Sequence, residues 1–198
     1  RNLPTFFSVL FLLIATLMLY SISVEKSAQK DRFRFHWWFM VILFFMVAAD
    51  EFMATHELIS EIVRDKYQVT GIFYYAWVIP FGILIMALGV IYSGFIFRYI
   101  PVNIRNLMIL SAALYVGGSI GMEMVGSYFY LRSGAENMTN AVLTSIEEGL
   151  EMTGISVFIY SLALYRQLME SDKKMLSVKQ NLHLIKGDTL AKNRKRAM

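Results

Sequence analysis

The chain has 198 residues, of which 57% are hydrophobic and 15% are aromatic. This composition, with a mean hydropathy of +0.50, argues against a soluble domain and favours a membrane protein. The net charge of +4 requires no nucleic-acid partner because the basic residues follow the loop bias of a membrane protein, and the absence of cysteine excludes disulfides and thiolate metal sites.

Five long apolar segments follow one another along the chain. Each is near or above the roughly 20 residues that a membrane-spanning helix needs, so we expect an all-α bundle of five transmembrane helices. The predicted spans are Pro4–Val24, Phe35–His56, Gly71–Phe97, Leu107–Tyr130 and Ala141–Tyr165.

Local features distinguish these spans. The second opens with "RFRFHWWFM", in which His36, Trp37 and Trp38 resemble an interfacial belt. In the third, Pro80 with Gly82 predicts a kink. The fourth, "SAALYVGGSIGMEMVGS", is rich in small residues that allow close helix packing.

Lysine and arginine predict the orientation. Four of them lie in the loop between the first and second spans, two in the loop between the third and fourth, and nine after the fifth span. The remaining four lie on the opposite side of the predicted bundle. The positive-inside rule therefore places the N-terminus outside and the C-terminus in the cytoplasm, and the bacterial inner membrane is the expected location. Residues 1–166 form the predicted transmembrane domain. Residues 167–198 form a basic cytoplasmic helix, ending near Gly187, and a tail. The chain starts at Arg1 rather than Met, so whether residues precede it is left open.

Acidic residues of three spans fall at one depth. With a rise of 1.5 Å per residue, the carboxylates of the second, fourth and fifth spans lie about 22 to 28 Å above the last cytoplasmic arginine, in the outer half of the bilayer. Helical geometry also predicts that they share inward faces, whereas Glu51 points away. The candidate site residues are Asp50, His56, Glu57, Glu123, Glu147, Glu148 and Glu151.

This layer contains no lysine or arginine, so its charges cannot all persist unless a cation balances them. Carboxylates with a histidine predict a divalent metal site for Fe, Mn, Zn or Ca, and the absence of paired Glu-x-x-His motifs counts against a di-iron centre. Protonated carboxylates, or glutamates lying among lipid headgroups, are the alternatives.

Three motifs, "ADEFMATHE", "GMEMVG" and "EEGLEMTGISVFIYSLALY", resemble those of uncharacterised bacterial multi-pass membrane proteins. The resemblance implies that the acidic positions belong together, and it implies no activity. Three functions follow from the residues: a metal site, which if redox-active would oxidise a lipid-soluble substrate; a proton or cation carrier; or an accessory subunit of a larger membrane complex. Besides the lipid bilayer, a second copy of the chain is a candidate partner. Whether the protein is an enzyme stays open.

Overall fold

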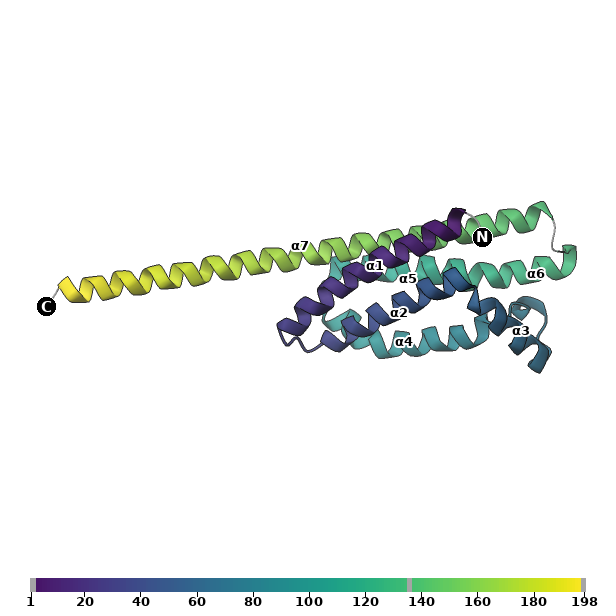
Figure 1. Ribbon diagram of the computed structural model, residues 1–198, viewed down its shortest axis with the longest axis horizontal. Helices are drawn as coiled ribbons and strands as arrows, with labels where there is room; N and C mark the ends of the chain where they lie inside the picture. Colours follow the sequence, from purple (N-terminus) through teal and green to yellow (C-terminus); the bar gives the residue numbers. More distant parts are fainter. Residues whose placement is uncertain (1–2, 135–136, 197–198) are drawn as a thin grey trace. The chain divides into compact units, whose positions relative to one another are not determined.

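The computed structural model describes residues 3–134 and 137–196, with the backbone alone for residue 133 and for residues 180–196. The chain divides into two units, Arg1–Leu162 and Ala163–Met198, each considered by itself. Throughout the described ranges the elements are helices, and no strand is present there. In chain order they are α1 (Leu3–Ala28), α2 (Arg34–Met53), α3 (Thr55–Tyr67), η1 (Gly71–Phe73), α4 (Val78–Arg98), α5 (Val102–Val116), η2 (Gly117–Met122), α6 (Glu123–Ser133) and α7 (Met138–Arg196) (Figure 1).

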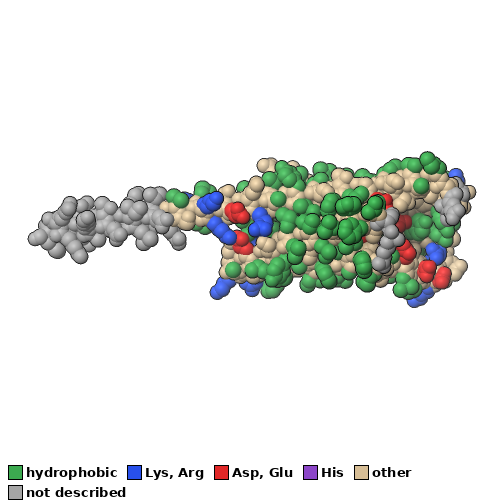
Figure 2. Space-filling view, turned by 45° about the horizontal axis from the view of Figure 1, so that its top comes forward, with side chains coloured by type: hydrophobic (Ala, Val, Ile, Leu, Met, Phe, Trp, Pro, Cys, Tyr) green, Lys and Arg blue, Asp and Glu red, His purple; other side chains and the backbone are tan. Residues whose placement is uncertain are grey.

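Four helices in the described part of the chain are long and apolar enough to cross a membrane: Leu3–Ala28, Arg34–Met53, Val78–Arg98 and Val102–Arg132. These correspond to the first four predicted spans. Many of their large apolar side chains face outward; on α4, for example, Met86 and Val90 are 73% and 74% exposed. Figure 2 shows the result for the first unit, an apolar middle with charged side chains gathered toward its two ends. Such a surface is suited to lipid.

The fifth predicted span lies within α7 and is not among the four candidate spans. Its beginning carries three glutamates, and the Thr, Gly and Ser residues that follow dilute its apolar character. The prediction of a separate short helix ending near Gly187 is wrong, because α7 is one helix that continues to Arg196. A glycine inside a helix costs about 1 kcal/mol relative to alanine, which is too little to end a helix by itself.

The second predicted span is too long at its outer end. Ala54 adopts a left-handed backbone conformation with φ of 55°, and its N–H donates to the carbonyl of Asp50 over 2.7 Å, which ends α2 at Met53. A new helix, α3, begins at Thr55. His56 and Glu57 therefore lie on a different helix from Asp50, and the predicted single helical face through these residues is wrong.

Pro80 does not interrupt a span. The helix α4 begins at Val78, so Pro80 lies in its first turn, where backbone N–H groups have no intrahelical acceptor. The predicted kink is therefore replaced by a helix start. The residues before it form η1 and a short connection up to Trp77.

The aromatic residues at the start of α2 pack inside the bundle. Trp37 is fully buried, and its ring lies 5.1 Å from that of Phe95 on α4. The imidazole of His36 stacks on Phe95 at 5.4 Å, and its carbonyl accepts a hydrogen bond from Tyr92. For His36 and Trp37, packing between α2 and α4 replaces the predicted interfacial belt.

The predicted close packing of the fourth span is present. Ser111 on α5 donates a hydrogen bond of 2.8 Å to the carbonyl of Gly154 on α7. A Cβ at Gly154 would lie 2.8 Å from the backbone nitrogen of Tyr115, so only glycine fits there. One turn further along, Gly118 approaches the backbone and side chains of α7 in the same way. These contacts join α5 and η2 to the acidic part of α7.

Candidate functional site

The break between α2 and α3 brings Asp50 against His56. Asp50 Oδ2 lies 2.8 Å from His56 Nδ1, and Oδ1 accepts the backbone N–H of His56 over 3.0 Å. Because an ionised carboxylate can only accept, Nδ1 carries the proton and Nε2 is the nitrogen that remains for a ligand. Asp50 thus caps the first turn of α3 and fixes the orientation of the imidazole.

Trp77 forms the next wall of the site. Its ring lies 5.2 Å from the ring of His56, and its side chain is 9% exposed. Two buried serines hold the backbone leading to it: Ser60 on α3 accepts the N–H of Ala76 over 2.7 Å, and Ser127 on α6 accepts the N–H of Tyr75 over 3.1 Å. The position of Trp77 is therefore set by two helices.

Glu123 is the first residue of α6 and directly follows the π-helical segment η2. A π-helical turn rotates each residue by less than the 100° of an α-helix, so the inward face that regular helical geometry predicts for Glu123 does not extend through this segment. Glu123 lies within electrostatic range of His56 and Glu57, and its carboxylate interacts with the indole of Trp77. π-helical turns frequently accompany functional sites.

The helix α7 brings the remaining carboxylates. Glu151 is buried, with 9% of its surface exposed, and Glu147 and Glu148 are half-buried. Glu151 lies within electrostatic range of Glu51, Glu123 and His56. The close approach at Gly118 fixes this part of α7, since a Cβ there would lie 3.1 Å from the Cγ of Glu151.

The predicted residues converge only in part. Glu51, predicted to point away, is half-buried and within electrostatic range of His56 and Glu148, so that prediction is wrong. Glu57 is exposed on α3, and its interaction with Glu123 is the electrostatic repulsion between the two carboxylates. Among the described residues, no group of three or more Asp, Glu or His side chains is arranged to hold one metal ion.

Two titratable groups beyond the ends of the candidate spans respond to these charges. Burial alone would lower the pKa of His56, but the hydrogen bond that the imidazole donates to Asp50 and the charges of Asp50, Glu123 and Glu51 outweigh it, so the pKa is raised. Burial, together with the charge of Glu123, raises the pKa of Tyr75 to about 12. The Tyr75 phenol is therefore a protonated hydrogen-bond donor at neutral pH.

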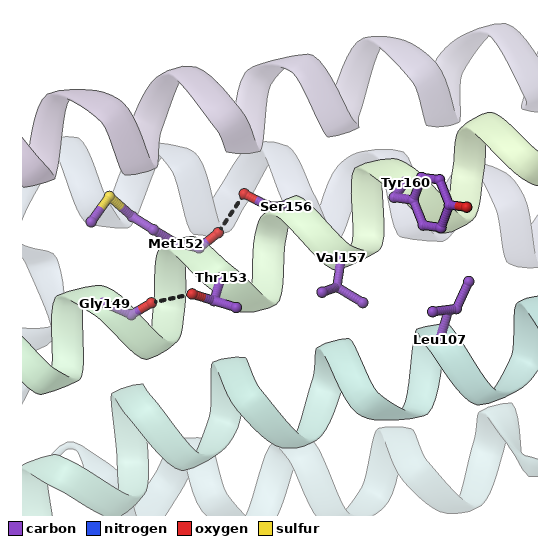
Figure 3. Close-up of a pocket in the computed structure, with 7 residues that line it drawn as sticks. All are labelled: Leu107, Gly149, Met152, Thr153, Ser156, Val157 and Tyr160. Atoms are coloured by element: carbon purple, nitrogen blue, oxygen red, sulfur yellow. Dashed lines mark hydrogen bonds between the residues drawn. The ribbon is translucent and has the colours of Figure 1, made fainter.

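A groove on α7 lies apart from the site. It is lined by Leu107, Gly149, Met152, Thr153, Ser156, Val157 and Tyr160 (Figure 3). The hydroxyls of Thr153 and Ser156 donate to carbonyls of their own helix, which leaves the walls apolar. At 100° per residue, Thr153 and Ser156 lie on the side of α7 away from Glu151.

Sequence reasoning did not identify Trp77, Ser127 or the π-helical segment as parts of this site. Trp77 stands in "YYAWVIP", where it is one aromatic among several. The nearest signal is its position three residues before Pro80, since proline favours a first helical turn and Trp77 therefore marks a helix start. For the serines, which accept single backbone hydrogen bonds, no signal exists in the sequence.

Fold and composition define the class of the protein, an α-helical bundle in which four of the described helices are long and apolar enough to cross a membrane. Residues 1–165 match the family described as "Domain of unknown function (DUF8692)", and the chain belongs to that family. Comparison with curated proteins and with solved structures gave no match.

Proposed function

We propose that the protein is an integral membrane protein that binds a divalent metal ion, Fe, Mn, Zn or Ca, at the carboxylate and histidine site in the outer half of the bilayer. The proposal includes α7 as the fifth span, with the N-terminus outside, the C-terminus in the cytoplasm and the bacterial inner membrane as its location. The lysine and arginine distribution supports this orientation.

One observation carries the proposal: the double contact of Asp50 with His56. In protein metal sites, a ligating histidine commonly donates its second ring nitrogen to a carboxylate, which fixes the tautomer and orients the ring toward the metal. The contact of 2.8 Å between Asp50 Oδ2 and His56 Nδ1 has this form. It assigns to Asp50 a positioning role and to His56 Nε2 the role of ligand.

The carboxylates supply the remaining ligands. Glu123 and Glu151 both lie within electrostatic range of His56 and come from α6 and α7. Glu147 and Glu148 adjoin Glu151 on the same helix, and Glu57 lies at the exposed edge. A dication would remove the repulsion among these groups. If the metal is redox-active, it would supply oxidation of a lipid-soluble substrate.

Elemental analysis tests the proposal directly. The full chain is purified in mild detergent without chelator, and its metal content is measured by mass spectrometry beside the variants His56→Ala, Glu123→Gln and Glu151→Gln. Glu61→Gln is the matched control, because Glu61 is an exposed glutamate on α3, the helix that carries His56. We expect stoichiometric metal in the wild type and the control, and loss of metal in the three site variants.

Two outcomes would contradict the proposal: wild-type protein that is stable and metal-free even after incubation with each of the four metals, or metal that stays bound in all three site variants. Each variant must elute from size-exclusion chromatography as the wild type does, so that loss of metal is separated from loss of fold.

The carrier and the accessory subunit stay as predictions from the sequence. Proton or cation flux into liposomes that disappears in Glu151→Gln would favour the carrier. A stoichiometric partner that co-purifies with the chain would favour the subunit. Neither role conflicts with a metal site, since a subunit or carrier can hold a metal ion.

A further inference from the structure

A second groove lies on the outward side of α4, at the end of the helix that leads into α5. It has a volume of about 390 Å³ and is lined by Ser93, Gly94, Phe97 and Arg98. The missing side chain of Gly94 opens it, because a Cβ there would meet no other atom within 4 Å. The groove is therefore accessible from the side of the bundle.

Arg98 places a positive charge in this groove. Its side chain is exposed, and within the described residues it forms no ion pair or side-chain hydrogen bond. A second cation comes from α5: the guanidinium of Arg105 lies 5.4 Å from the centre of the Phe97 ring, and its Nη1 donates to the Phe97 carbonyl over 3.3 Å. The groove wall at Phe97 thus adjoins a further positive charge.

The acidic residues at this end of the first unit have partners of their own. Asp31 accepts a hydrogen bond from Tyr99 and forms an ion pair with Lys26 at 3.6 Å, and Glu25 accepts a hydrogen bond from Gln29 at 3.1 Å. The basic residues at the same end outnumber them: Lys26, Lys30, Arg32, Arg34, Arg98 and Arg105. This excess of positive charge favours an anionic ligand from outside the protein.

Toward the middle of α4 the same face is apolar. At 100° per residue, Arg98, Gly94, Val90 and Ile83 lie within about 80° of one another. Val90 and Ile83 are 74% and 68% exposed. A cation at the helix end, followed by an open groove and an exposed apolar stripe, matches a molecule with an anionic head and a hydrocarbon tail.

We propose that this groove binds an anionic phospholipid, with its phosphate at Arg98 and an acyl chain along Gly94 and Val90. The planar guanidinium suits phosphate oxygens, and basic pockets at the cytoplasmic side of membrane helices bind lipid headgroups. A soluble polyanion would leave the apolar stripe without a role. The proposal does not involve the metal site, and it rests on the proposed orientation only for the leaflet in which the lipid lies.

Native mass spectrometry of the full chain in detergent tests the proposal. The protein is titrated with phosphatidylglycerol and, separately, with phosphatidylcholine that carries the same acyl chains. Arg98→Gln removes the cation, and Gly94→Leu fills the groove without changing the charge. We expect the wild type to bind phosphatidylglycerol more tightly than phosphatidylcholine, and each variant to bind phosphatidylglycerol about five- to tenfold more weakly.

Each variant has a matched control. Arg32→Gln removes the same charge from an exposed arginine at the same end of the bundle. Gly89→Leu adds the same side chain to α4 at a position where a Cβ also meets no atom within 4 Å, about 140° around the helix from Gly94. Both controls should bind phosphatidylglycerol as the wild type does, and all four variants must elute from size-exclusion chromatography at the wild-type position.

Three outcomes would overturn the proposal. Equal affinity of the wild type for the two lipids would show that the headgroup is not recognised. Equal losses in Arg98→Gln and Arg32→Gln would show a diffuse attraction instead of a site, and wild-type affinity in Gly94→Leu would show that the groove does not seat the lipid. Because the metal content is measured separately, this proposal and the proposed function can fail independently.

Discussion

Replacing Gly154 by alanine should push α5 away from α7, the helix that carries Glu151. The new Cβ would lie 2.8 Å from the backbone nitrogen of Tyr115 and 3.0 Å from the carbonyl oxygen of Ser111. Both are backbone atoms and cannot move aside by a rotamer change, so α5 and α7 must move apart. Overpacking of this kind typically costs about 1 to 3 kcal/mol.

Gly149→Ala is the matched control on the same helix. A Cβ at Gly149 meets no other atom within 4 Å. Both substitutions gain about 1 kcal/mol of helix propensity, so the difference between them isolates the packing cost. We expect Gly149→Ala to be as stable as the wild type or more stable, and Gly154→Ala to be less stable than Gly149→Ala by about 1 to 3 kcal/mol.

The measurement is thermal unfolding in detergent, followed by circular dichroism, at matched protein and detergent concentrations. The metal content of the two variants is measured in parallel, because separation of α5 from α7 also displaces Glu151. Equal unfolding temperatures for Gly149→Ala and Gly154→Ala would refute the argument that the close approach at Gly154 holds the bundle together.

Three further predictions concern the site and its supports. Ser60→Ala removes the acceptor of the buried Ala76 N–H and should lower stability by about 1 to 3 kcal/mol in the same unfolding assay, whereas Ser145→Ala, at an exposed hydroxyl on α7, should change little. Asp50→Asn should weaken metal binding about 10- to 100-fold in competition with a chelating dye, and an affinity equal to that of the wild type would argue against the positioning role of Asp50. Because the pKa of His56 is raised, its proton competes with the metal up to a higher pH than usual; metal affinity should rise with pH and level off above that pKa, while a pH-independent affinity would exclude His56 as a ligand.

The four candidate spans were predictable because the bilayer imposes a length on apolar helices. The residues at which those spans end could not be predicted in the same way. The end of α2 depends on the backbone of Ala54 and the start of α3 on the carboxylate of Asp50, and neither contact leaves a trace in hydrophobic periodicity. The same holds for η2, since a π-helical turn uses the residues Gly117–Met122 that an α-helix would also accept.

The candidate site shows a similar division. The identities of the acidic residues could be predicted from their cost in an apolar span, and His56 from its position beside them. The arrangement of these residues relative to one another could not be predicted. A regular helix through residue 57 placed Glu51 outside the group and Asp50 and Glu57 on one helical face, whereas the break at Ala54 puts Glu57 on a separate helix. An error of one helix boundary therefore altered the predicted ligand set.

Three irregular backbone features of the first unit adjoin residues of the candidate site. The left-handed Ala54 follows Asp50, the π-helical turn precedes Glu123, and the connection before α4 leads to Trp77. Non-helical backbone at membrane depth persists only where it is buried in protein or lines a cavity, and a non-glycine residue in the left-handed region costs of order 1 kcal/mol or more. Gly154 lies within a regular helix, whereas Gly118 lies within η2, so the close approach to α7 accounts for part of the irregularity there. The glycine contacts do not involve Ala54 or the connection to Trp77; under the proposed function, a metal ion bound by Nε2 of His56 would account for those two breaks, because they set where Asp50, His56 and Trp77 leave the backbone.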